Sequence, residues 1–600
     1  MFLRKYTRTK AGKQHCYYAL VESVRTASGP RQQVVAHLGE LNHDQESRWQ
    51  RTVTFHNRQG EACQLRLFPD DENAPLPDDP DIVRIRLGTV GWTNARRFGD
   101  VWLGLQLWRM LRLDDILNRR LPQGRHTERP ADIVAVEVIN RLCQPCSEFA
   151  LAEHWYASTG LEDLLGIRDD AITKDRLYRT LDALRNAQTE IENDLKERLG
   201  ALFQLDYDLL LYDLTSSYFE GLAEDDELAA RGYSRDHRSD CKQIVLALVV
   251  TSEGFPLAHV TLVGNTQDGA TVRRIVEMVE NRFGVSQRVW VMDRGMINDD
   301  NLKFLNRRRY LLACRRSTLN RFHAALQTSK GWQRFPDNDE VEIKEIRKGK
   351  VTYLLARSQP RRAKERAIRR RQLLGLHRGL RKLRQRVAKG RLKQRDKILE
   401  SVGRLKGRFP KAASLATIRV AAPAAVSWKW DVPRLKAAMA RDGAYVLRTN
   451  QPGWPPQQLW QTYMQLTVVE KAFRVLKTDL LLRPIWHQYS GRVQAHVFIC
   501  VLAYALWKTL DHLARQAGLL TMIRKPDPTR RKACPKPRPM TPTVILRELA
   551  KIQIGDILLE TTAGQQLALR RIARPDAEQS RILAALKMAL PERLSADRLL

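Results

Sequence analysis

The sequence predicts an α/β protein whose central mixed sheet is interrupted by a large insertion, with smaller modules on either side. Three strand-like apolar runs joined by short turns occupy residues 208–264, and a helix–strand–helix–strand pattern follows over residues 271–316. Another strand-like run appears at residues 442–450, after a long basic stretch without strand periodicity. Short turns connect antiparallel strands and helical crossovers connect parallel ones, so the sheet should be antiparallel at one edge and parallel elsewhere.

The first 85 residues are predicted to form a β-rich N-terminal module. Residues 14–26 and 31–41 alternate apolar and polar side chains, which is typical of half-buried strands, and the turn Ser28-Gly29-Pro30 lies between them. An acidic, proline-rich linker over residues 69–81 follows. The module, residues 1–85, is a candidate DNA-binding element.

A helical domain is predicted next, over residues 86–205, because the apolar period there becomes helical. Pro130 stands where a helix can begin, in front of a long apolar run. The first part of the sheet domain follows over residues 206–320, and its final helices occupy residues 451–515. A basic, proline-rich linker then leads into a small C-terminal module within residues 516–600.

Residues 321–450 are interpreted as an insertion that returns to the sheet near residues 442–450. Its middle section is crowded with Lys and Arg, yet apolar residues recur at steps of three and four. They are Leu373, Leu376, Leu380, Leu383 and Val387. This two-heptad stripe predicts a helical arm or a coiled-coil hairpin. The cations fit either a solvated face or a surface that follows DNA, and the pattern leaves both readings open.

The charge balance favours a polyanionic partner. The chain has 102 Lys and Arg against 67 Asp and Glu, a formal net charge of +35. Nucleic acid is the first candidate and an anionic membrane the second, and such charge argues against a small neutral substrate. The most apolar segment, residues 495–507, is too short to span a bilayer and is flanked by Arg492 and Lys508, so we interpret it as a buried core helix. The N-terminus lacks a signal-peptide pattern.

The cysteines do not indicate a disulfide framework. Eight are scattered along the chain. Cys143 and Cys146 form a single CxxC, which lacks the second pair of ligands that a zinc site of this kind requires. We therefore expect reduced thiols in a cytosolic protein.

Two aspartates stand at the ends of strand-like runs. Asp293 follows residues 289–292, and Asp213 follows residues 209–212. On neighbouring strands, two carboxylates about 4 Å apart would repel by roughly 4 kcal/mol at an effective dielectric constant near 20. Such a pair is tolerated when one carboxyl is protonated or when a cation lies between them. Oxygen ligands favour Mg²⁺ or Mn²⁺ over zinc, so the pair predicts a divalent-metal site.

A third acid is expected, because two metal ions need more than two carboxylates. Glu470 is the candidate, since helical spacing places it on one face with a phenol and two cations. That face consists of Tyr463, Leu466, Glu470, Arg474 and Lys477. Neighbouring apolar residues would dock the helix on the sheet. The alternative is an exposed stripe in which Glu470 pairs with Arg474 one turn away.

Several stretches resemble the DDE transposases of bacterial insertion sequences, in the branch whose ribonuclease H-like fold carries a large insertion before the final Glu. The stretches include "YDLTSSYFEG", "VWVMDRGM", "DGAYVLRTN" and "VEKAFRVLKTDLLL", and the likeness covers nearly the whole chain. The resemblance implies that Asp213, Asp293 and Glu470 bind two Mg²⁺ (or Mn²⁺) ions in an enzyme that cleaves DNA and transfers strands. It also implies double-stranded DNA as partner, both transposon ends and target, a homodimer on DNA, no membrane, and a cytoplasmic location at the bacterial nucleoid.

The helix signature of that family is Tyr, two residues, Arg, three residues, Glu, six residues, Lys. Tyr463, Glu470 and Lys477 match it, but Leu466 stands at the Arg position. A phosphate contact is then missing or supplied by another cation. The predicted DNA-binding set consists of Tyr463, Arg474, Lys477 and Arg294.

Other marks of the family have ordinary structural explanations beside the functional one. Asn265 and Asp268 would line the site or simply form a turn. His487 and His496 recur in the family, but a histidine on a core-facing helix more often bonds a backbone group. Some relatives steady a flipped base on an aromatic side chain of the insertion, which core packing explains equally well here. The aromatic candidates are Trp428, Trp430 and Tyr445.

Two other functions share this charge and fold. A catalytically inactive DNA-binding regulator derived from a transposase would only occupy element ends, and a ribonuclease H-like nuclease would act on RNA–DNA hybrids or repair intermediates. The intact acids argue against the first, and the terminal modules and the insertion argue against the second. The chain contains no phosphate-binding loop of the G-x-x-x-x-G-K-[ST] type, which is consistent with an exchange of phosphodiesters that needs no nucleotide.

Overall fold

The protein is described by a computed structural model that covers residues 2–10, 13–26, 29–40, 53–56, 62–65, 85–122, 128–285, 287–335, 338–421, 425–521, 537–562, 564–592, 594, 598 and 599. Two compact units are present, and each is considered by itself. One spans Met1–Gly88 and Glu560–Gln565, and the other spans Thr89–Leu559 and Gln566–Leu600.

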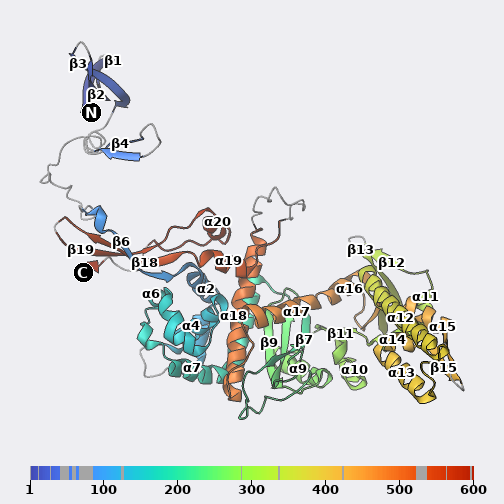
Figure 1. The fold of residues 1–600 in the computed structure, drawn as a ribbon. Coiled ribbons are helices and arrows are strands. Elements are labelled where there is room, and N and C mark those ends of the chain that lie inside the picture. The colour runs from blue at the N-terminus through green and yellow to red at the C-terminus, as the bar shows by residue number, and fades with distance from the viewer. Residues whose placement is uncertain are drawn as a thin grey trace. The chain divides into compact units, whose positions relative to one another are not determined.

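The first unit is built of antiparallel strands (Figure 1). One sheet consists of β1 (Phe2–Lys10), β2 (Lys13–Thr26) and β3 (Gly29–Glu40), and a separate ladder consists of β4 (Val53–His56) and β5 (Ala62–Leu65). Gly29 has φ +105°, a backbone conformation that glycine adopts readily at a turn. The β-rich character predicted for the N-terminal region is confirmed. The predicted linker at residues 69–81 lies outside the described residues.

The second unit begins with a strand and a group of helices. They are β6 (Gly91–Arg97), α2 (Gly99–Met110), α3 (Leu113–Arg120), α4 (Pro130–Cys143), α5 (Glu148–Ala150), α6 (Leu161–Leu165), α7 (Lys174–Asn186) and α8 (Gln188–Phe203). Helix α4 begins at Pro130, whose fixed φ suits a first helical position. Every residue of α4 from Ala131 to Leu142 is buried, because α2, α3, α7 and α18 (Ser490–Gln516) pack around it.

A nine-stranded mixed sheet forms the centre of this unit, in the order β12-β13-β14-β17-β11-β10-β7-β8-β9. The strands are β7 (Leu209–Tyr218), β8 (Gln243–Thr251), β9 (Pro256–Val263), β10 (Val289–Met292), β11 (Arg309–Ala313), β12 (Gln333–Phe335), β13 (Asn338–Lys348), β14 (Val351–Ser358) and β17 (Ala444–Thr449). Strands β7, β10 and β11 pair in parallel, and the remaining neighbours pair antiparallel. The predicted fold class, a mixed α/β sheet with helices, is confirmed. The expectation that the sheet is antiparallel at one edge only is wrong, because the insertion adds antiparallel strands at the other edge.

The two faces of the sheet contribute to different cores. Side chains alternate along each strand, so Leu211 and Val291 join the core shared with α17 (Leu466–Arg474) and α18, while Tyr212 and Met292 join the core on the other face. Helices α9 (Asp268–Phe283) and α10 (Asp299–Leu305) cover that second face.

Helix α18 lies between the helical group and the sheet (Figure 1), where it packs against α4, α7 and β9. Among the described helices, it alone is long and apolar enough to cross a membrane. However, 89% of its apolar window is buried inside the protein. The interpretation of residues 495–507 as part of a core helix is therefore confirmed.

The insertion contributes both strands and a separate helical arm. The sequence pattern missed the strands β12, β13 and β14, because charged residues alternate with the apolar ones in β13 and mask its period. Strand β17 pairs with β11 on one side and with β14 on the other, so the insertion extends the sheet. The arm consists of α12 (Gln359–Ala388), α13 (Arg395–Arg408), α14 (Pro410–Ala413), β15 (Ala416–Ala421), β16 (Ala425–Trp430) and α15 (Val432–Ala440).

The C-terminal part pairs with the start of the same unit. It contains α19 (Pro542–Leu549), β18 (Gln553–Glu560), β19 (Gln566–Ile572), α20 (Ala577–Ala585) and β20 (Arg598–Leu599). Strand β18 pairs antiparallel with β6, which joins residues far apart in the sequence into one four-stranded sheet. Of the eight cysteines, the six whose state the structure describes are free thiols, as predicted for Cys143 and Cys146.

Candidate active site

Strand register brings Asp213 and Asp293 together. Tyr212 of β7 is paired with Met292 of β10, and each aspartate is the next residue along its strand. Because the strands are parallel neighbours, spaced roughly 4.8 Å apart, the two carboxylates lie side by side on the same face of the sheet. The expectation that both aspartates follow their strands is correct for Asp293 alone, because β7 continues past Asp213 to Tyr218. That face is the one on which Leu211 and Val291 meet α17.

The closeness of the two acids contributes to a pKa of Asp213 that is raised to about 7. Burial is the largest cause, because it disfavours the charged form, and the negative charge of Asp293 adds to it. The backbone N–H of Leu214 and the guanidinium of Arg235 act in the opposite direction without cancelling the effect. In the protein alone, the site holds an incompletely compensated pair of acids, which is the situation a bound cation relieves.

Asp293 has a hydrogen-bond donor on a helix far away in the sequence. The hydroxyl of Tyr463, near the end of α16 (Pro456–Met464), donates to Asp293 Oδ1 over 3.2 Å. Burial and the neighbouring charge of Asp293 raise the pKa of Tyr463 well above its ordinary value, so the phenol remains a donor at neutral pH. The contact fixes the orientation of the Asp293 carboxylate.

Glu470 faces the same pocket from α17, which packs against β7. The pocket has a volume of about 540 Å³, and Asp213, Asp293 and Glu470 all line it. Glu470 is exposed, and it forms no ion pair with Arg474 in the described part of the chain. The exposed stripe with a Glu470–Arg474 pair is therefore not what the structure contains.

The three acids share this pocket, but their carboxylate oxygens do not meet as ligands of a single ion. Among the described residues, the set of three acidic, His or Cys side chains whose ligand atoms all lie within 4.8 Å of one another is a different one, Glu148, His487 and His496. The ligand atoms of the triad are more widely separated than that. Catalytic contacts in protein without substrate are often long and tighten in the complex.

The group formed by Glu148, His487 and His496 already contains a positive charge of the protein, the guanidinium of Arg141. Arg141 Nη2 donates to Glu148 Oε1 over 3.2 Å and lies 3.4 Å from His496 Nδ1. Burial opposes ionisation of Glu148, but the hydrogen bond with His487 and the charge of Arg141 outweigh it and lower its pKa. Burial lowers the pKa of His496 far below its ordinary range, and its Nε2 lies 3.4 Å from the Leu482 carbonyl oxygen. This group is a buried polar contact between α4, α5 and α18.

The predicted phosphate-binding cations differ in their surroundings. Arg294 is exposed and lines the pocket, and Arg474 is exposed beyond it. Lys477 is buried, and its Nζ donates to Asp236 Oδ1 over 2.9 Å, beside a second bond from Arg483 to the same oxygen. For Lys477 to contact DNA, its ion pair with Asp236 would have to break.

The pocket has further lining that the sequence pattern did not single out. Leu466, at the family's Arg position, is buried in its wall. Arg315 also lines it, is exposed, and has no acidic group within 4.0 Å among the described residues. Arg315 follows β11, whose Leu312 is paired with Met292 of β10, so it emerges at the same edge of the sheet as Asp293. The predicted strand ran to residue 316 and so included Arg315, whereas β11 ends at Ala313 and leaves Arg315 beyond it.

The remaining candidates lie outside this pocket or serve packing, with one exception. Asn265 and Asp268 line a neighbouring groove of about 610 Å³, which meets the pocket at Arg315. Asp268 Oδ1 accepts a 2.7 Å bond from Arg235. Trp428 packs in the arm, and Trp430 does likewise. Tyr445 is the exception, because it lines the pocket, where its hydroxyl accepts a bond from Trp460.

Comparison with protein families decides the identity. The model of the transposase DDE domain matches residues 205–506, which is half of the chain and includes every member of the acidic triad. The chain belongs to the insertion-sequence DDE transposases. The N-terminal domain model of the IS1634 family transposases matches residues 3–64 of this transposase. A search among curated proteins found no match.

Members of this family use divalent metal ions and act on DNA. The donor set of the transposase fits such a group, because Asp213 and Asp293 offer hard oxygen ligands side by side on neighbouring strands. The predicted recognition as an insertion-sequence DDE transposase is confirmed. The roles of the individual site residues stay predictions.

Proposed function

We propose that this transposase binds the ends of its insertion sequence, cleaves them by phosphodiester hydrolysis and joins them to target DNA by transesterification. The single observation that carries the proposal is the convergence of Asp213 and Asp293, by strand register, in the pocket that Glu470 of α17 also lines. We assign these three residues as the catalytic acids. They would hold two Mg²⁺ or Mn²⁺ ions.

When bound, the two ions would lower the pKa of an attacking water and stabilise the departing 3′-oxygen. The residues of the chain supply the rest. Tyr463 holds the Asp293 carboxylate in one orientation through its hydrogen bond. Arg294 and Arg315, both exposed at the pocket, would contact the scissile phosphate. They would take the role of the family's Arg, whose position is occupied here by Leu466.

The reaction balances without a nucleotide. Water adds to the phosphorus, the bond from phosphorus to the 3′-oxygen breaks, and the departing oxygen takes a proton to become a free 3′-hydroxyl. That hydroxyl then attacks a target phosphate, the bond from this phosphorus to the target's own 3′-oxygen breaks, and the released oxygen takes the proton to become a free target 3′-hydroxyl. One phosphodiester is thereby replaced by another. Two ends must join the target in one event, so the proposal includes a homodimer on DNA, acting in the cytoplasm at the nucleoid.

Each segment of the chain has a proposed role in this reaction. Residues 1–85 and the C-terminal module 516–600 would recognise the element ends, and the helical domain 86–205 would support the catalytic core. The core would comprise residues 206–320 and 451–515, with the insertion 321–450 between them. Arg474, and Lys477 if its contact with Asp236 opens, would add phosphate contacts.

The test begins by sequencing the DNA that flanks the gene, where the proposal expects matched inverted repeats. Duplexes carrying them are incubated with Mg²⁺ and the wild type, or with Asp213→Asn, Asp293→Asn, Glu470→Gln, or the control Asp115→Asn, which changes an exposed acid of α3 in the helical domain. Nicking is expected from the wild type and the control alone, while all five proteins bind the duplex. Full nicking by any triad variant would refute the assignment.

The same assay separates the two alternative functions. A regulator would bind the ends without nicking them under any divalent metal. A ribonuclease H-like nuclease would cut an RNA–DNA hybrid but give no joined product with a target plasmid. The proposed transposase joins the end to the plasmid, and the product depends on the 3′-hydroxyl, because an end that terminates in a dideoxynucleotide is not joined.

A further inference from the structure

The positive charge of the transposase is concentrated in one part of the insertion, residues 359–441, which we call the basic arm. These 83 residues contain 26 Lys and Arg and four Asp and Glu, so they carry +22 of the net charge of +35. The other 517 residues carry +13. Most of the excess charge therefore lies in the arm.

The helices and strands of the arm pack against one another around a hydrophobic core of their own. Leu376, Leu380 and Leu383 of α12 are buried against Ile398 and Val402 of α13, with residues of α14, β15 and β16 completing the same cluster. The stripe predicted from the sequence is thus the seam of a small folded body. Its outer surface is free to serve another purpose.

The acidic partners of the α12 cations are gathered at the base of the arm, while α13 and the start of α15 each carry one local ion pair, Arg404 with Glu400 and Arg434 with Asp431. Asp442 binds Arg369 through both oxygens, and Glu365 bonds Arg316 and Arg361. These contacts hold the start of α12 to the sheet, since Asp442 directly precedes the segment that enters β17. Beyond the base, the structure shows no such partners for the cations of α12 among the residues it describes.

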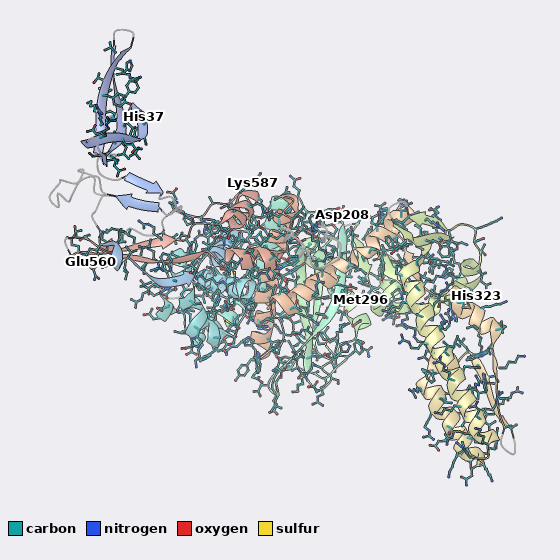
Figure 2. The ribbon with its side chains drawn as sticks, turned by 45° about the horizontal axis from the view of Figure 1, so that its top comes forward. His37, Asp208, Met296, His323, Glu560 and Lys587 are labelled. Atoms are coloured by element: carbon teal, nitrogen blue, oxygen red, sulfur yellow. The ribbon has the colours of Figure 1, made fainter. Side chains whose placement is uncertain are left out.

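The outward face of α12 is a row of unpaired cations. Lys364, Arg371, Arg378 and Lys382 recur at steps of seven, seven and four, opposite the buried leucines, and all four are exposed. Among the described residues, no acidic group lies within 4.0 Å of any of them. At 1.5 Å per residue the row extends for about 27 Å. The long side chains of the arm stand out from its helices in Figure 2.

A solvated surface alone does not explain this arrangement. Soluble proteins intersperse charges of both signs, because a field of one sign repels itself. Here the repelling charges are fixed on a folded body, and a polyanion would remove the cost. A membrane fits poorly, since a helix that lies on a bilayer needs a large apolar face beside its cations. Among the described residues of the arm, the exposed large apolar side chains are Leu374, Leu399, Val432 and Met439, and they are divided among α12, α13 and α15.

We propose that the basic arm is a docking surface for the phosphate backbone of duplex DNA, outside the catalytic pocket. The row Lys364, Arg371, Arg378 and Lys382 follows the backbone without reading bases, as charge contacts to phosphate do. The arm thus supplies sequence-independent affinity. The inference rests on the proposed function in so far as DNA is the polyanion, and it is tested by binding alone.

The experiment compares two full-length variants that remove the same charge. One is K364Q/R371Q/R378Q/K382Q in the arm, and the control is R109Q/R112Q/R274Q/R307Q, four exposed cations elsewhere. Binding of a labelled mixed-sequence duplex of about 30 base pairs is measured between 50 and 200 mM salt. At a slope of about −0.9 per phosphate, the arm variant should flatten log K against log salt by about 3.6 units and bind at least tenfold more weakly at 100 mM.

Several outcomes would overturn the proposal. The first is an unchanged salt slope in the arm variant. The second is an equal loss of DNA affinity in the control, which would mean that only net charge matters. The third is tighter binding of the same-sequence RNA duplex, or of phosphatidylserine vesicles, than of DNA. Matching thermal unfolding midpoints show that both variants fold. A second arm variant, R371K/R378K, keeps the charge and should keep the slope.

The result is separable from catalysis. Asp213→Asn, which the proposed function expects to be inactive, should keep the full salt slope, whereas the arm variant should still nick element ends at low salt. Loss of nicking with normal DNA binding therefore tests the role of the triad. Loss of the salt slope with intact nicking tests the role of the arm.

Discussion

The hydroxyl of Tyr463 donates a hydrogen bond of 3.2 Å to Oδ1 of Asp293, across 170 positions of sequence. The bond links helix α16 to the carboxyl end of strand β10, and it ties the predicted helix face directly to the paired aspartates. It positions an acid that the proposed reaction uses without itself taking part in bond breaking.

Replacing Tyr463 by Phe should slow cleavage without unfolding the protein. A hydrogen bond to a charged group contributes about 1.5–3 kcal/mol, so the single-turnover nicking rate is expected to fall roughly 10- to 100-fold. Tyr489→Phe, at an exposed tyrosine, is the matched control and should nick at the wild-type rate. An unchanged rate for Tyr463→Phe would show that Asp293 is oriented by other contacts.

The metal-free protein should lose stability as the pH rises through 7. The pKa of Asp213 is about 7 in the folded state, above its unfolded value, so the folded state retains the proton longer. This contribution to stability is complete below about pH 4 and disappears as the pH passes 7. Thermal unfolding in EDTA at pH 5.5 and pH 8 should show a larger pH-dependent drop for the wild type than for Asp213→Asn.

Divalent metal should reverse that loss. Mg²⁺ binds the ionised carboxylates of the folded protein and not the unfolded chain, so it stabilises the fold by mass action. At pH 8, Mg²⁺ is expected to raise the unfolding midpoint of the wild type and to have little effect on Asp213→Asn. Equal shifts in both proteins would place the responsive metal site elsewhere.

Glu470→Gln should separate catalysis from stability. Glu470 is exposed and has no ion-pair partner among the described residues, so its replacement should change the free energy of unfolding by no more than about 0.5 kcal/mol. Nicking should nevertheless be lost. Denaturant unfolding and a cleavage assay on the same preparation check both statements, and a stable variant that still nicks would remove Glu470 from the triad.

The main expected effect of Lys477→Met is a loss of stability. The substitution leaves Asp236 buried with Arg483 as its remaining ion-pair partner among the described residues, so the free energy of unfolding should fall by about 1–3 kcal/mol.

Arg474→Gln, at an exposed site, should leave stability unchanged and flatten the salt slope of DNA binding by about 0.9 units. A similar flattening for Lys477→Met would show that Lys477 also contacts phosphate in the complex.

Much of the candidate site could be predicted because strand and helix periods place side chains on defined faces. Spacing predicted that Asp213 and Asp293 lie close together and that Glu470 and Tyr463 face the same site, and the pocket does contain all four. However, Asp213 lies inside β7 rather than at its end, and the single predicted helix is divided at Gln465 into α16 with Tyr463 and α17 with Glu470. Arg315 was missed because the sequence does not say which strands are neighbours. The register of β10 with β11 supplies that information.

Strands β13 and β14 were missed for a related reason. In β13, charged residues alternate with apolar ones at the edge of the sheet, and a charged period of two is a weak signal inside a basic segment. Only pairing with β14, and of β14 with β17, makes these residues part of the sheet. Lys477 likewise stood on the expected helix face, but its engagement with Asp236 depends on a loop from another part of the chain.

By itself, the sequence determined most of the helices and strands outside the insertion, which of their faces are apolar, and where the acids and the excess charge lie, because these follow from local periodicity and composition. Tertiary structure alone decided which strands are neighbours, which cations have partners and which acids share a pocket. Those relationships are set by the pairing of segments far apart in the chain, and no local pattern encodes it.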